Sequence, residues 1–100
     1  MRKCVKMIVT DYHDVDVFYK ALKKRANVGA VEGVAEPLSD EELQIVVYGP
    51  KESVDEFVGA VEDTVITIAE EGDDQASELM VEPFIKEEDY RGVFRFIKKS

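Results

Sequence analysis

Residues 3–10 are mostly apolar and rich in β-branched side chains, which is typical of a β-strand. Apolar side chains fall on both faces of this segment, with Val5, Met7 and Val9 on one face and Cys4 and Ile8 on the other. A strand that is apolar on two sides is typical of the centre of a sheet, with helices over its more apolar face. We therefore expect this strand to lie centrally.

Two later segments have the spacing of amphipathic helices. The apolar stripe of the first consists of Val15, Phe18, Leu22 and Ala26. The second segment runs from Pro50 to Gly72, and its apolar residues keep helical spacing for about five turns. One continuous helix is the preferred interpretation, although the β-branched run TVITI also permits an end near Asp63.

Four further strands are indicated. Residues 30–37 and 42–49 are predicted to form a hairpin across the turn LSDE. The second of these strands again carries apolar residues on both faces, so it also belongs in the centre of the sheet. Residues 78–86 and 92–98 are predicted as two more strands. Pro83 lacks the N–H that a central strand needs, so the strand that contains it is expected at an edge.

The order of elements is strand, helix, strand, strand, helix, strand, with a short extra strand at the C-terminal end. This order predicts an α+β fold of the ferredoxin-like βαββαβ plan, a sandwich with two helices on one face of an antiparallel sheet. A chain of 100 residues with 45% apolar composition can close one modest core, so residues 1–100 are expected to form a single domain. This plan hosts many unrelated functions and names none by itself.

Acidic residues outnumber basic ones, and the formal net charge is −9. Nucleic acids and anionic membrane surfaces are bound through Lys and Arg, so we expect neither as a partner. Cys4 is the single cysteine and cannot form an internal disulfide. The chain has no apolar run of membrane-spanning length, and its N-terminal segment reaches Asp11 too early for a signal peptide. The simplest interpretation is a cytoplasmic protein.

Two stretches of the chain resemble the acylphosphatase family. The family's first signature, G-V-G-F-R at the loop into the first helix, is similar to Asp16-Val17-Phe18-Tyr19, followed by Lys20 and a helix with Ala26. The second signature, G-aromatic-V-R-N before a turn with D-G and a strand closing in G-P, resembles GVAEPLSDEELQIVVYGP. Its matching positions are Val34, Asp40, Leu43, Ile45, Gly49 and Pro50, with Pro37 as a one-residue insertion.

The catalytic residues of that family are not carried over. The resemblance places Tyr19 where an arginine of the family holds the acyl phosphate, and Glu36 where an asparagine orients the attacking water. If the one-residue insertion is placed elsewhere, Pro37 instead of Glu36 takes the position of the asparagine. The loop DYHDVD has three aspartates and no glycine to turn backbone N–H groups towards a phosphate. We therefore expect a non-catalytic module that binds a small ligand or a protein through Asp11, His13, Tyr19 and Glu36. The alternative is an acylphosphatase-type hydrolase with a modified site.

His13 stands between Asp11 and Asp14, a pattern that also occurs around metal ions. A second nitrogen or thiolate ligand is missing from this stretch, and turn formation and helix capping account for the aspartates. Neither a metal site nor a cofactor is predicted. Cys4 is expected to be a buried, unreactive thiol in the central strand.

The sheet face opposite the helices leads to a prediction about partners. The apolar residues expected on this open face are Cys4, Ile8, Val46 and Tyr48. Large contiguous apolar patches mark contact surfaces, and two-fold dimers are the commonest oligomers, so we expect a homodimer across this face. In the alternative, Lys6, Gln44 and Arg95 interrupt the patch and the chain is a monomer.

Overall fold

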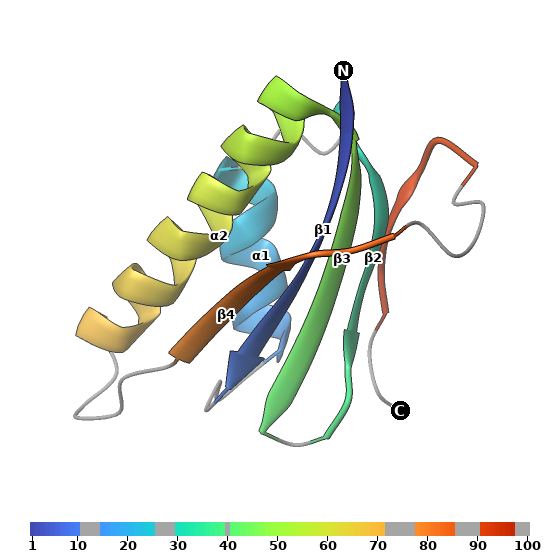
Figure 1. Cartoon of the computed structure of the whole chain (residues 1–100). Coiled ribbons are helices and arrows are strands. Elements are labelled where there is room, and N and C mark those ends of the chain that lie inside the picture. Colours follow the sequence, from blue (N-terminus) through green and yellow to red (C-terminus); the bar gives the residue numbers. More distant parts are fainter. Residues whose placement is uncertain (11–14, 26–29, 40, 72–77, 86–90, 98–100) are drawn as a thin grey trace.

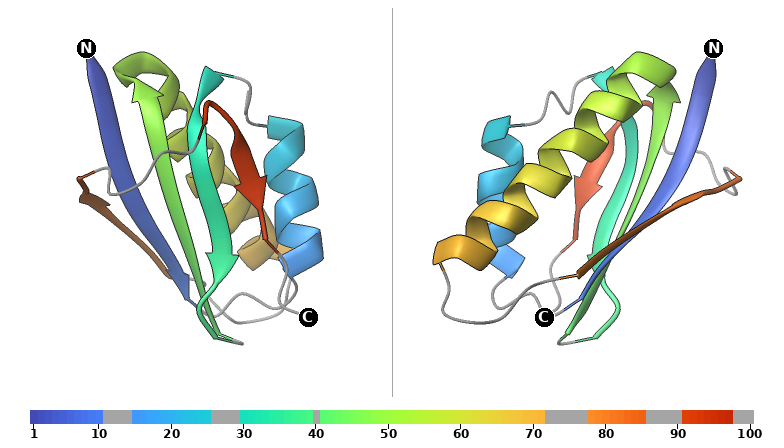
Figure 2. Two further views of the ribbon diagram at one scale, coloured as in Figure 1. Left: turned by 90° about the vertical axis from the view of Figure 1, so that its right-hand side faces the viewer. Right: turned by 60° about the vertical axis from the view of Figure 1, so that its left-hand side comes forward.

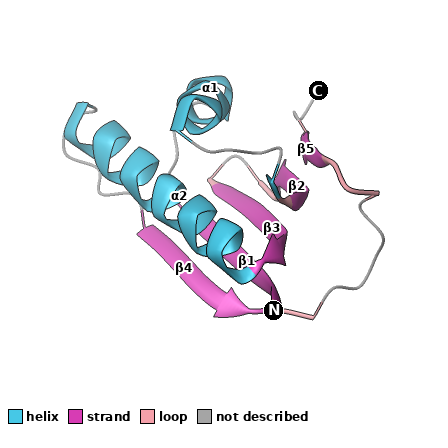
Figure 3. Ribbon diagram, turned by 90° about the horizontal axis from the view of Figure 1, so that it is seen from above, coloured by secondary structure: helices cyan, strands magenta, loops and turns pink. Residues whose placement is uncertain are grey.

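The computed structural model describes residues 1–10, 15–25, 30–39, 41–71, 78–85 and 91–97. The strands and helices in chain order are β1 (Arg2–Thr10), α1 (Val15–Arg25), β2 (Glu32–Pro37), β3 (Glu42–Pro50), α2 (Lys51–Glu71), β4 (Glu78–Pro83) and β5 (Phe94–Phe96). They form one sheet with the strand order β4-β1-β3-β2-β5. Both helices lie on the same face of this sheet, and the opposite face carries no described element (Figures 1 and 3).

This arrangement confirms the predicted α+β fold of the ferredoxin-like plan. β1 and β3 lie inside the sheet, and β4, which contains Pro83, lies at an edge as predicted. The pairs β1–β3, β1–β4 and β2–β3 are antiparallel, whereas β5 runs parallel to β2 at the other edge, so the sheet is mixed. α2 continues without interruption to Glu71, which confirms the interpretation of one long helix.

The core lies between the helices and the helix-facing sides of the strands. Its buried strand residues are Val5, Met7, Val9, Ala35, Leu43, Ile45 and Val47, and Val31 directly before β2 joins them. Its buried helix residues are Phe18, Tyr19, Leu22, Val54, Phe57, Ala60, Val61 and Val65. Burial of one large apolar side chain contributes roughly 2 kcal/mol, so the alternating strands and the two helical stripes hold the layers together. The burial of Tyr19 was not predicted, because its position lies beside the stripe defined by Phe18 and Leu22.

The edge strand β5 is placed by aromatic packing. It pairs with β2 over three residues only, with Phe94 opposite Gly33 and Phe96 opposite Ala35. The ring centroid of Phe94 lies 4.8 Å from that of Phe57 in α2. The ring centroid of Phe96 lies 5.1 Å from that of Tyr19 in α1. Small residues on β2 thus stand beside large rings on β5, and these rings contact both helices. Figure 2 shows β5 beside β2 at the edge of the sheet.

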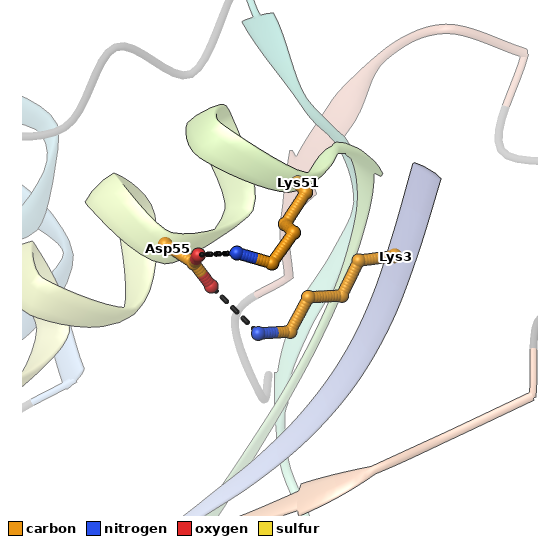
Figure 4. A network of polar contacts seen from close by, with 3 residues as sticks. All are labelled: Lys3, Lys51 and Asp55. Atoms are coloured by element: carbon orange, nitrogen blue, oxygen red, sulfur yellow. Dashed lines mark hydrogen bonds and ion pairs between the residues drawn. The ribbon is translucent and has the colours of Figure 1, made fainter. Parts of the chain in front are cut away.

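Charged side chains join the beginning of β1 to the first turn of α2 (Figure 4). Lys3 Nζ donates to a carboxylate oxygen of Asp55 at 2.6 Å, and Lys51 Nζ lies 3.4 Å from the other oxygen. The hydrogen bond from Lys3 holds the pKa of Asp55 below its ordinary value of 3.8, and Lys51 adds to this effect. Any stabilisation from the pair is therefore present at neutral pH and is lost as the pH falls through the lowered pKa.

Neither described helix combines the length and the apolar character required to cross a membrane.

Gly33 is the position where the sheet tolerates no side chain. Its φ of 148° is unfavourable for other residues, and a Cβ atom there would overlap the carbonyl oxygen of Val46 in β3. The backbones of β2 and β3 therefore approach each other more closely here than a β-carbon allows.

We expect Gly33→Ala to lower the free energy of unfolding by about 3 kcal/mol, because backbone atoms must move to relieve the overlap. The matched control is Gly59→Ala in α2, where a Cβ would meet no atom within 4 Å. This control should raise the free energy of unfolding by roughly 0.5–1 kcal/mol through helix propensity. Urea unfolding followed by circular dichroism measures both values, and equal stabilities of the two variants would contradict the prediction.

Candidate functional site

The candidate site lies at the end of the molecule where β1 and β2 finish and α1 begins. Thr10 at the end of β1 is paired with Glu42, and Pro37 at the end of β2 is paired with the adjacent Leu43. The ends of these two strands therefore flank the beginning of β3, as the lower part of Figure 1 shows. The resemblance described above assigns the phosphate-binding loop and both catalytic positions to this end.

Tyr19 in α1 is turned into the protein at this end. Its side chain is 2% exposed, and its hydroxyl oxygen lies 2.9 Å from the carbonyl oxygen of Ala35 and 2.7 Å from that of Ile97. The hydroxyl donates its proton to these carbonyl groups, and the N–H of Ile97 also donates to the Ala35 oxygen at 2.8 Å. One side chain of α1 therefore ties together the end of β2 and the residue that follows β5.

Glu36 does not lie beside Tyr19. It is paired with Gln44, whereas its neighbour Ala35 is buried in the core, so the Glu36 side chain belongs to the open face. Pro37, the alternative match for the catalytic asparagine, is on the helix-facing side of β2 by the same alternation. The structure thus separates the two predicted binding residues Tyr19 and Glu36 by the thickness of the sheet.

The other two predicted binding residues, Asp11 and His13, lie outside the described residues, and so does the loop between β1 and α1. The binding roles of all four residues therefore stay predictions. Within the described residues, no group of three His, Cys, Asp or Glu side chains could hold a metal ion.

Carboxylates surround the described part of this end. Asp16 lies in the first turn of α1, Glu41 and Glu42 lie at the start of β3, and Glu78 begins β4 opposite Thr10. The lysines of α1 lie in its later turns, at Lys20, Lys23 and Lys24. Lys23 Nζ stands 4.8 Å from the ring centroid of Phe96, over an aromatic ring. Of these carboxylates, Asp16 lies in α1 itself, whereas Glu42 and Glu78 belong to the open face of the sheet.

The open face is covered mainly by its own polar side chains. Val46 at its centre is 2% exposed in the single chain, whereas Met80 on β4 is 61% exposed. Lys6 Nζ lies 3.0 Å from a Glu82 oxygen and 5.2 Å from the ring centroid of Phe84. Lys6 thus interrupts the apolar patch of the open face, as the monomer alternative expects. The homodimer across this face stays a prediction.

Comparison with known proteins shows which structures share this α+β architecture. An acylphosphatase from Coxiella burnetii matches with a TM-score of 0.66 and 22% identity, covering 96% of this chain and 93% of its own. An acylphosphatase from Bacillus subtilis matches with a TM-score of 0.66 and 18% identity, covering 97% and 99%. The chain thus has an acylphosphatase-like fold.

The same fold also matches a part of larger proteins. A bacterial light-regulated adenylyl cyclase aligns with a TM-score of 0.57 and 16% identity over 98% of this chain, but over only 28% of its own length. No family model and no curated protein matches the sequence.

The structural role of Tyr19 could have been suspected from the sequence. An aromatic residue next to Phe18 and three positions before Leu22 widens the apolar stripe of α1. The polar contacts of its hydroxyl had no sequence signal, because Ala35 and Ile97 contribute only backbone carbonyl groups.

We expect Tyr19→Phe to lower the free energy of unfolding by about 1–2 kcal/mol, because the buried carbonyl groups lose a donor while the ring packing is kept. Tyr19→Leu should cost more, since it also removes the contact with Phe96. Urea unfolding measures both differences. A Tyr19→Phe variant as stable as the unmodified chain would show that the hydroxyl contributes nothing to the fold.

Proposed function

We propose that this chain is a non-catalytic binding or regulatory module with an acylphosphatase-like fold. The observation that carries the proposal is the state of Tyr19, which occupies the position that the resemblance assigns to the phosphate-binding arginine. An arginine would present a fork of N–H donors to the phosphoryl oxygens. Tyr19 has a single O–H donor, and that donor is already engaged with backbone carbonyl oxygens.

The surroundings of Tyr19 also disfavour an acyl phosphate. The carbonyl groups of Ala35 and Ile97 turn the negative ends of their dipoles towards this position. Asp16 adds a carboxylate in the first turn of the same helix. A phosphate dianion at this position would be repelled by these groups.

The likeness to larger proteins supports a regulatory role. A fold that makes up about a quarter of a light-regulated adenylyl cyclase also serves as one part of a regulated protein. Of the predicted binding residues, Glu36 is half-buried on the open face and within reach of a ligand there. Asp11 and His13 would contribute from the loop, and Tyr19 would fix the beginning of α1 beneath it.

The first test is hydrolysis of acetyl phosphate by the purified chain. We expect the rate to equal that in buffer, because no guanidinium fork holds the phosphoryl oxygens. The chain should be measured together with Tyr19→Phe and Glu36→Gln. Hydrolysis above the buffer rate would favour the acylphosphatase-type alternative, and a loss of that rate in either variant would assign the catalysis to the predicted site.

The second test concerns the open face. The burial of Val46 in the single chain and the pairing of Lys6 with Glu82 favour the monomer alternative over the homodimer expected from the sequence, so sedimentation at micromolar concentration should give one species near 11.3 kDa. A species of twice this mass that returns to the monomer on Met80→Lys would instead support the homodimer across the open face. Lys20→Glu on α1 is the control, because it changes a charge on the helix-covered side of the molecule.

A further inference from the structure

β4 forms one of the two edges of the sheet, and β5 forms the other. Among the described residues β4 pairs with β1 alone, and the views in Figures 2 and 3 place it at the margin of the sheet. A strand at an edge presents a row of backbone N–H and C=O groups that another strand can bind.

The hydrogen-bond pattern shows which residues of β4 offer these groups. The N–H of Phe84 donates to the carbonyl of Cys4 at 3.1 Å, so this opposed pair is hydrogen-bonded. Hydrogen-bonded and non-hydrogen-bonded pairs alternate in an antiparallel ladder. Leu79, Val81 and Pro83 are therefore the residues whose backbone groups point away from β1. Pro83 has no N–H to offer, whereas Leu79 and Val81 each present a donor and an acceptor.

The side chains of β4 offer contacts to an added strand on both faces of the sheet. Leu79 packs against the core on the helix-facing side, and Val81 on the same side is 43% exposed. On the open face Met80 is 61% exposed. It borders a shallow hollow of about 390 Å³ lined by Ile8, Thr10, Glu78, Leu79 and Met80. Apolar side chains of an added strand would therefore find contacts on both sides.

The charges along the edge select the partner. Glu78 and Glu82 lie on either side of Met80 on the open face. Glu82 is partly neutralised by Lys6 at 3.0 Å, and among the described residues no cation lies within ion-pair distance of Glu78. An added strand with Lys or Arg at the positions beside these carboxylates would gain cross-strand charge pairs.

A second copy of the chain fits this edge less well. Antiparallel pairing about Met80 would set Glu78 of each copy opposite Glu82 of the other, and directly opposed like charges destabilise a strand pair. Pairing about Val81 would set Leu79 opposite Pro83, which cannot donate. Each copy also carries a net charge of −9, which adds a long-range repulsion.

We propose that the free edge of β4 binds an extended segment of a partner protein that carries basic side chains on one face and apolar side chains on the other. The segment adds a sixth strand, with backbone bonds to Leu79 and Val81 and with a lysine or arginine beside Glu78. This binding mode specifies the partner of the proposed module, and it does not depend on whether the chain hydrolyses acyl phosphates.

The probe is a fluorescein-labelled heptapeptide, Gly-Lys-Val-Leu-Val-Lys-Gly amide, which places lysines and a leucine on one face and valines on the other. Fluorescence anisotropy should show saturable binding with a Kd on the order of 100 μM, which weakens as salt is added. The same peptide with glutamate in place of both lysines should bind at least about tenfold more weakly.

Two variants of the chain locate the site. Val81→Pro removes an N–H that points to the free edge and leaves the bonds to β1, so it should weaken peptide binding about tenfold with an unchanged circular dichroism spectrum. Glu78→Lys should weaken the lysine peptide and strengthen the glutamate peptide. Its matched control is Glu56→Lys on the exposed side of α2, which makes the same change in net charge and should leave the preference for lysine intact.

The results that overturn the proposal are equally specific. Absence of saturable binding up to about 1 mM peptide would exclude a useful affinity for such segments. Binding that is the same in Glu78→Lys and in the unmodified chain would place the peptide elsewhere, even if Val81→Pro fails to fold. A dimer in the absence of peptide that Val81→Pro converts to a monomer would make a second copy the occupant of this edge.

Discussion

The hydroxyl group of Tyr19 holds together the end of the molecule that contains the candidate site. Tyr19 donates to backbone carbonyl groups that belong to β2 and to the residue after β5, so a helix, an inner strand and an edge strand meet at one buried oxygen. β5 has only three paired residues and relies on this bond and on aromatic packing for its place. The same bond occupies the donor that would otherwise face a ligand. Structural and catalytic uses of this position therefore exclude each other.

The two faces of the sheet have different physical characters. The helix-facing side of β1 and β3 is closed to solvent, whereas the open face is a mosaic in which apolar side chains lie under or between charged ones. Lys6 illustrates this, because its ammonium group reaches both a carboxylate and an aromatic ring. The charged side chains thus reduce the contiguous apolar area that the open face presents to water.

Much of the fold was predictable from the sequence, because the signals were periodic. Alternation in β1 and β3 revealed two-sided strands at the centre, and Pro83 marked the edge. The parallel orientation of β5 was not evident, because it depends on small residues such as Gly33 standing beside Phe94 in space. The candidate site was less accessible to prediction. The resemblance placed Tyr19 and Glu36 at the two catalytic positions of one site, but a strand's two-residue period puts Glu36 on the face of the sheet away from Tyr19.

The strand order also determines how the chain must be assembled. β1 begins at the second residue, yet it lies inside the sheet and completes its pairing only with β4, where Thr10 contacts a residue 68 positions later. Contacts of such long sequence separation slow folding, because the intervening chain must be closed into a loop before they form. During synthesis both helices and the β2–β3 hairpin precede β4, so β1 can be packed on its apolar face and paired with β3 before the strand that completes its pairing has emerged. β1 therefore completes its strand pairing late, after both helices and the β2–β3 hairpin have been made.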